Sequence, residues 1–288
     1  MPEISVLTAS PKTLNWLDQI ENGRVLNIFP DVLNLTDNSD QILSIVAEKI
    51  GNGPFSLVVE AVNFAHAIGI EDQISFKDQS LKVGRNIFST KGCQIWNPVP
   101  NWVAFPKAST NYLIIQIEGQ LSEVGVKEGF IEVFYPEKIL NQTKFYSKME
   151  SGSSLLLDAL MKQDEGKLIS AAGSLAGLGV GLTPSGDDFL VGVIYALWAV
   201  LRREEAVSTA ESIWTGAARR TTSLSRAWLA AAVAGETGEP WHKFINAVIE
   251  QNEEKIMNAT NEILLIGATS GADAICGFVQ ALKILEER

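Results

Sequence analysis

The chain has 288 residues, of which 46% are hydrophobic and 20% are charged, a composition typical of an ordered globular protein. Its formal net charge of −11 argues against non-specific binding to nucleic acid or to anionic lipid. The two cysteines, Cys93 and Cys276, and the two histidines, His66 and His242, are widely spaced, so neither a disulfide framework nor a Cys/His metal site is predicted.

The N-terminal half contains short segments rich in β-branched and aromatic residues, separated by Gly, Pro, Asn and Asp. We expect two short helices here, near residues 11–20 and 40–49. The segments that we expect to form strands are 24–29, 55–60, 81–84, 93–98, 112–119 and 130–135. The sequence therefore predicts a β-rich domain over residues 1–148, built as a curled sheet or barrel.

From about residue 150 the hydrophobic spacing becomes helical, and several segments begin with a Ser or Thr that can cap a helix. Beyond a helix that begins near residue 151, we expect helices at 165–176, 184–203, 206–219, 222–235, 240–250, 253–265 and 270–286. An all-helical domain over 149–288 follows, which makes the fold class α+β.

The most apolar run, FLVGVIYALWAVL at 189–201, spans about 20 Å as a helix, less than the roughly 30 Å hydrocarbon core of a bilayer. We expect a buried helix there and no membrane segment. The N-terminal stretch MPEISVLTAS lacks a basic segment followed by an apolar one, so no signal peptide is predicted and a cytoplasmic location is expected.

One motif occurs twice in the helical half. SGDDFLVG (185–192) and SGADAICG (270–277) both fit Ser-Gly-x-Asp-x-x-x-Gly, and each follows a threonine, Thr183 or Thr269. A mid-helix glycine costs roughly 1 kcal/mol relative to alanine, so Gly192 and Gly277 predict that another backbone approaches closely. The simplest candidate is the other motif helix, and the two first turns would then form one cleft.

This cleft is our candidate site, because helix N-termini favour anions and glycines let backbone amides approach a ligand. The residues assigned to it are Gly179, Gly181, Thr183, Ser185, Gly186, Asp187, Asp188, Thr269, Ser270, Gly271 and Asp273. The alternative stays open at this stage: an Asp in a first turn is often only a cap, and the repeat could serve packing.

A third segment, ARRTTSLSRAW at 218–228, places Thr222, Ser225 and Arg226 on one helical face. The guanidinium group suits carboxylate or phosphate, and the hydroxyls can hydrogen-bond to either. We add these three residues to the predicted substrate-binding set. In the alternative interpretation, the threonine caps the helix and the arginines are solvated charges.

Three segments together resemble the AllH family: GLGVGLTPSGDDFLVG (177–192), TTSLS (221–225) and GATSGADAICG (267–277). The usual first motif has Pro where this chain has Val180. The resemblance implies one subunit of a three-part oxamate carbamoyltransferase of allantoin breakdown, a hetero-oligomer in which two larger subunits are the partners. That enzyme converts carbamoyl-oxamate and phosphate into oxamate and carbamoyl phosphate.

The resemblance makes the carboxylates Asp188, Asp273 and Asp187 the candidate catalytic residues. They could orient the carbamoyl amine, transfer protons or, as oxygen ligands, hold Mg²⁺; no cofactor is required by the pattern. Two other functions are consistent with the sequence. One is a non-catalytic anion-binding or scaffold subunit, and the other is an independent metal-assisted hydrolase that uses the same three aspartates.

Overall fold

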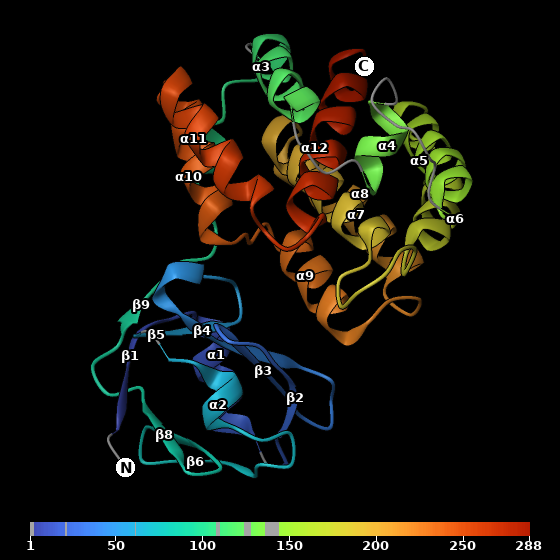
Figure 1. Cartoon of the computed structure of the whole chain (residues 1–288). Coiled ribbons are helices and arrows are strands. Elements are labelled where there is room, and N and C mark those ends of the chain that lie inside the picture. Colours follow the sequence, from blue (N-terminus) through green and yellow to red (C-terminus); the bar gives the residue numbers. More distant parts are fainter. Residues whose placement is uncertain (1–2, 21, 61, 108–109, 124–127, 136–143) are drawn as a thin grey trace. The chain divides into compact units, whose positions relative to one another are not determined.

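A computed structural model describes residues 3–20, 22–60, 62–107, 110–123, 128–135 and 144–288 (Figure 1). The chain forms two compact units. Met1–Val99 together with Thr237–Glu239 make one, here called the strand unit, and Pro100–Glu236 together with Pro240–Arg288 make the other, the helical unit. A β-rich region followed by a helical region confirms the α+β prediction.

The strand unit contains a nine-stranded sheet among its described residues. Its strands are β1 (Ile4–Ala9), β2 (Arg24–Ile28), β3 (Val32–Thr36), β4 (Ile42–Ala47), β5 (Ser56–Val59), β6 (Ile74–Lys77), β7 (Ser80–Val83), β8 (Asn86–Ser89) and β9 (Gln94–Ile95). The strands follow the order β2-β3-β4-β5-β1-β8-β7-β6, and β9 pairs with β1. A bridge between Arg24 and Gln73 links the two ends, so the sheet curls into a barrel-like form.

Strand alternation builds the core of this unit. Leu33 and Leu35 of β3 lie beside Leu43 and Ile45 of β4, and all four side chains are fully buried in one apolar cluster. These residues point to the same face of the sheet, and the alternate residues Asn34 and Ser44 on the other face are buried as well. The helix α1 (Pro11–Gln19) begins where Ser10 accepts a hydrogen bond from the Thr13 N–H, in agreement with the helix expected at 11–20. The short helix α2 (Phe64–Ala67) follows β5.

The helix expected at 40–49 is wrong. Residues 42–47 form β4, which pairs antiparallel with β3 and parallel with β5, and a single 3-10 turn, η1 (Glu48–Ile50), follows. Every residue of β4 is buried, so its apolar run is nearly continuous. A run of this kind cannot be assigned to strand or helix by periodicity.

The helical unit contains most of the helices predicted, within a few residues of the expected ends. A 3-10 turn, η2 (Trp102–Ala104), precedes them. In the described residues, the helices of this unit are α3 (Thr110–Glu123), α4 (Phe130–Phe134), α5 (Tyr146–Met161), α6 (Glu165–Leu175), α7 (Ser185–Val200), α8 (Arg203–Ala217), α9 (Ser223–Val233), α10 (Glu239–Ile249), α11 (Glu253–Leu264) and α12 (Ser270–Glu286). None of the helices in the described ranges is long and apolar enough to cross a membrane.

Two segments expected as strands, 112–119 and 130–135, lie instead in α3 and α4. In α3 the buried residues Leu113, Ile117 and Leu121 recur every four positions and pack toward α12 and α11. Their β-branched neighbours suggested a strand, but burial on a helical stripe decides the conformation. The helical unit begins near residue 100, whereas the sequence predicts a boundary at 148.

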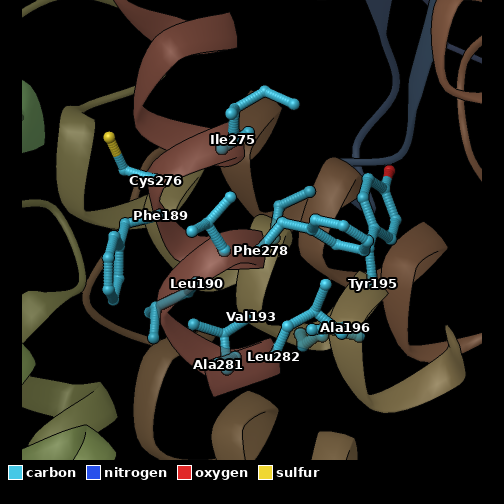
Figure 2. Close-up of a cluster of buried hydrophobic side chains, with 14 of the residues drawn as sticks. Phe189, Leu190, Val193, Tyr195, Ala196, Ile275, Cys276, Phe278, Ala281 and Leu282 are labelled. Carbon is cyan, nitrogen blue, oxygen red and sulfur yellow. The ribbon is translucent and has the colours of Figure 1, made fainter. Parts of the chain in front are cut away.

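The core of the helical unit is centred on α7 and α12, which make their most extensive contact with each other. Figure 2 shows side chains from both helices packed together, among them Phe189, Val193, Phe278 and Leu282. All four are fully buried, and the Phe278 ring makes edge contacts with Trp241 and Phe244 of α10. The run at 189–201 is therefore a buried helix, as predicted.

Candidate functional site

The two motif helices cross at their motif glycines. A Cβ atom on Gly192 would overlap the carbonyl oxygen of Ala274 in α12, and a Cβ atom on Gly277 would overlap that of Phe189 in α7. Only a residue without a side chain allows two helix backbones to approach this closely. The prediction that each glycine accommodates the other motif helix is confirmed.

The loops that lead into the two helices also repeat the same geometry. We call residues 176–184 the first motif loop and 265–269 the second motif loop. The Gly186 N–H donates to the Leu178 carbonyl at 2.8 Å, and the Gly271 N–H donates to the Ile266 carbonyl at 3.0 Å. The sequence repeat is therefore a structural repeat of two helix-loop-helix pairs, α6–α7 and α11–α12.

Two carboxyl groups interact across the helix crossing. The hydroxyl of Ser185 in α7 interacts with Asp273 of α12, and the hydroxyl of Ser270 in α12 interacts with Asp188 of α7. Each serine thus faces the aspartate of the other motif. The Ser270 hydroxyl also lies 3.0 Å from that of Thr183, which joins the two motif loops at the site.

Asp273 is fully buried, and burial raises its pKa to about 7. Its Oδ1 accepts a hydrogen bond of 2.7 Å from the Phe130 N–H, which together with Ser185 and Thr269 opposes this rise. Its Oδ2 has no hydrogen-bond partner in the part of the chain that the structure describes. A carboxyl that titrates near neutral pH suits proton transfer.

The carboxyl group of Asp188 also has a raised pKa. Burial raises its pKa well above the ordinary value, and the negative charge of Asp273 raises it further, while Ser270 and Thr183 act in the opposite direction. Its Oδ2 is also buried without a hydrogen-bond partner among the described residues. Two buried carboxyl groups that repel each other ionise in turn, not together.

Asp187 differs from the other two aspartates because both its oxygens are engaged. Oδ1 accepts from the Gly177 N–H at 3.0 Å, and Oδ2 accepts from the Thr221 hydroxyl. Burial raises its pKa, and these two bonds and Ser225 oppose that rise. Through these two hydrogen bonds, Asp187 links the first motif loop to the segment before α9.

The third predicted segment lies beside the first motif loop. Thr222 caps α9, because its hydroxyl accepts from the Ser225 N–H at 3.1 Å, and it also donates to the Leu182 carbonyl at 2.6 Å. Ser225 is buried next to Asp187, and Arg226 is half-buried on α9. Thr222 and Ser225 therefore join the site region, and the capping interpretation of Thr222 also holds.

Several backbone amides of the two motifs donate hydrogen bonds inside the chain. Besides those of Gly186 and Gly271, the Asp187 and Asp188 N–H groups donate to the Pro184 carbonyl, and the Asp273 N–H donates to the Thr269 carbonyl at 2.8 Å.

Gly179 and Gly181 have positive φ angles in the first motif loop, and Gly181 is exposed with open space around it. Hydroxyl and carboxyl groups thus dominate the available chemistry.

No three His, Cys, Asp or Glu side chains in the described ranges gather in an arrangement that could hold a metal ion. Asp187 turns its oxygens to Gly177 and Thr221, so it does not complete a ligand set with Asp188 and Asp273. The geometry of the three aspartates does not favour the Mg²⁺ interpretation.

Sequence reasoning missed two contributors, Thr221 as a donor to Asp187 and the Gly129–Phe130 turn that contacts Asp273. A Cβ atom on Gly129 would overlap Asp273 Oδ1, so the turn fits tightly over the carboxyl. The Phe130 ring stacks on Phe189 with ring centroids 4.1 Å apart. Thr221 lies within the quoted TTSLS, but nothing in the sequence links residue 129 to residue 273.

Comparison with known proteins identifies the family of the chain. No solved structure matches the chain. A family model described as the oxamate carbamoyltransferase subunit AllH matches residues 175–282, which include both motifs, both motif loops and α9. A second model, the AllH family N-terminal domain, matches residues 5–95 and so covers the strand unit. The chain therefore belongs to the AllH family, the family of an oxamate carbamoyltransferase subunit.

Proposed function

We propose that this chain is the subunit that handles the carbamoyl group in a phosphorolytic carbamoyltransferase, with Asp188 and Asp273 as its acid–base pair. In the reaction, an oxygen of phosphate bonds to the carbamoyl carbon of carbamoyl-oxamate. The bond between that carbon and the oxamate nitrogen breaks, and the nitrogen takes up a proton. The setting that we propose is allantoin breakdown in the cytoplasm.

The observation that carries this proposal is the pair of buried carboxyl groups with raised pKa values at the helix crossing. Near neutral pH the pair retains one proton, because ionising both would place two negative charges in one buried site. The neutral carboxyl donates the proton to the leaving nitrogen, and the phosphate hydroxyl returns it. The ionised carboxyl accepts a hydrogen bond from the carbamoyl NH₂ group.

The surrounding residues then have supporting roles. We assign the anionic parts of the substrates to the hydroxyls of Thr183, Ser185, Thr269 and Ser270, and to the face of α9. That face consists of Thr222, Ser225 and Arg226, while Gly179, Gly181, Gly186 and Gly271 shape the loops. Asp187 is a positioning residue, because its bonds to Gly177 and Thr221 hold the first motif loop. Two larger subunits complete the enzyme.

The test uses the Asp188→Asn and Asp273→Asn variants in the reconstituted transferase, with phosphorolysis of carbamoyl-oxamate as the assay. Each variant should lower kcat at least about 100-fold, a typical effect of removing an acid–base group, with the melting temperature of the isolated chain retained and all subunits assayed far above their dissociation constants. The control is Asp158→Asn, a half-exposed carboxylate on α5 that pairs with Lys162. Full activity of both motif variants would remove the catalytic role.

A non-catalytic anion-binding or scaffold subunit is the second candidate function. It is supported by the use of the motif amides inside the chain, because hydrogen bonds of this kind stabilise the two helix-loop-helix pairs. Calorimetry of the isolated chain with phosphate, oxamate and carbamoyl phosphate distinguishes the two candidates. Binding by the wild type, together with unchanged turnover in the Asp variants, would favour the second.

A further inference from the structure

The motif loops expose an unusual number of aliphatic side chains next to the carboxyl pair. Val180 is 73% exposed and Leu182 39% in the first motif loop, while Leu265 is 82% exposed and Ile266 39% in the second. The two loops meet where the hydroxyls of Thr183 and Ser270 lie 3.0 Å apart. Adjacent exposed aliphatic residues are typical of protein interfaces.

Hydrogen bonds fix the conformation of both motif loops, so their apolar side chains are exposed on an ordered surface. The Leu182 carbonyl accepts from Thr222, and the Ile266 carbonyl accepts from the Gly271 N–H. The Gly177 N–H is bound to Asp187 at the start of the first loop. A surface that is already ordered loses little conformational entropy when a partner binds.

The two motif loops and the helix starts that follow them carry no basic side chain. Residues 176–188 and 265–273 include no Lys, Arg or His. Of their three aspartates, Asp187 and Asp273 are buried and Asp188 is partly exposed. Asp188 and Asp273 each have one buried oxygen without a hydrogen-bond partner in the described residues. Charge complementarity across an interface therefore favours a partner that presents a basic side chain. Such a side chain would add to the positive charge that Arg226 offers the two anionic substrates.

From these observations we propose that the two motif loops form the docking face for another subunit of the carbamoyltransferase, which contributes an apolar surface and a basic side chain directed at Asp188. The active site is then completed at this interface. The inference rests on the proposed function only in that the chain is a transferase subunit, and it does not require the aspartates to be catalytic.

In the experiment, the chain is co-expressed with the other transferase subunits, and assembly is measured by size-exclusion chromatography with light scattering. Titration of the chain with the other subunits gives the dissociation constant. The variant is Val180→Asp with Leu265→Asp, two exposed positions where a charge does not disturb the core. Its dissociation constant should rise at least about 100-fold, with the melting temperature of the isolated chain unchanged. The milder pair, Val180→Ala with Leu265→Ala, should weaken assembly about 10-fold.

The matched control is Leu155→Asp on α5, which is 58% exposed and belongs to neither loop; it should assemble as the wild type does. Raising the salt concentration should weaken the wild-type complex more than the Asp188→Asn complex. Undiminished assembly of the Val180/Leu265 variant would overturn the proposal. The proposal would also be overturned if the isolated chain self-associates through these loops and the complex with the other subunits still forms after the loops are substituted. The face would then join two copies of this chain.

Turnover is assayed with all subunits far above their dissociation constants, so that lost activity reports chemistry and not assembly. A variant that assembles but does not turn over then concerns the proposed function alone. A variant that fails to assemble at ordinary concentrations but turns over at high ones concerns the docking face alone.

Discussion

Asp273 is the residue at which burial, hydrogen bonding and chemistry meet most clearly. Its side chain is fully buried, its Oδ1 is bound to the Phe130 N–H, and its pKa is raised to about 7 from the ordinary 3.8. A carboxyl whose pKa is raised on folding stabilises the folded chain most where it is neutral in both states. That contribution is complete below about pH 4 and is lost as the pH rises through about 7.

An Asp273→Asn variant tests this at the level of one residue. Asparagine keeps an oxygen for the Phe130 N–H but cannot ionise. We therefore expect its free energy of unfolding to fall less than that of the wild type between pH 4 and 8, by up to about 4 kcal/mol. Urea unfolding across that range measures the difference, with Asp158→Asn as the control. Parallel curves for Asp273→Asn and the wild type would show that Asp273 is not buried as a neutral acid.

At the residue scale, the sequence could predict which motif residues lie close together at the helix crossing but not which contacts each of them makes. The repeated Ser-Gly-x-Asp pattern correctly brought Ser185 and Ser270 close to Asp273 and Asp188. It could not separate Asp187, which links the first motif loop to the segment before α9, from Asp188 beside it, because adjacent residues on a helix point about 100° apart and only the surroundings differ. The hydrogen bond from the Phe130 N–H to Asp273 could not be predicted, since a backbone donor has no sequence signature.

Among the elements, the pair α7 and α12 depends on the glycines at its crossing. Gly192→Ala and Gly277→Ala each place a methyl group on a backbone carbonyl of the other helix, an overlap that rotamer changes cannot relieve because the obstructing atom is not a side chain. Each substitution should lower the free energy of unfolding by at least about 3 kcal/mol.

The control for these substitutions is Gly119→Ala, on the exposed face of α3 with no atom within 4 Å of the added methyl group. It should stabilise the chain by up to about 1 kcal/mol, because alanine is the better helix former. Denaturant unfolding compares the three variants. Equal effects at all three positions would show that helix propensity decides the cost and that close packing does not.

The elements themselves were predictable where one period dominated. The helices after residue 150 have several turns and capping residues such as Asp164 and Asn252, both of which accept an N–H three positions on. Prediction failed for β4 and α3, whose apolar residues fit either period. Their conformations depend on the partners β3 and β5 for the first and α12 for the second, and those contacts are long-range.

For the whole molecule, the return of the chain to the strand unit could not have been predicted. Thr237–Glu239 belong to that unit, where the Asn52 N–H and side-chain amide both donate to Glu239 Oε2, at 2.9 and 2.7 Å. A contact between residues this far apart in sequence leaves no local pattern. The boundary near residue 100 was missed for a related reason, because α3 and α4 had the composition of strands.

Each unit has its own hydrophobic core, which leads to a prediction about the molecule as a whole. Ile45 belongs to the core of the strand unit and Ile194 to that of the helical unit, and both are fully buried. Ile45→Ala and Ile194→Ala remove the same atoms, so each should cost about 2–5 kcal/mol. Because the cores are separate, the loss should fall mainly on one unit in each variant.

Hydrogen exchange measured by mass spectrometry on the full chain resolves where the loss falls. Ile45→Ala should speed exchange in β3, β4 and β5 while α7 and α12 remain protected, and Ile194→Ala should do the reverse. The rate of phosphorolysis in the assembled enzyme should fall more in Ile194→Ala than in Ile45→Ala, since the carboxyl pair lies in the helical unit. If both variants loosen both units equally, the two cores unfold as one, and the strand unit then contributes directly to the stability of the site.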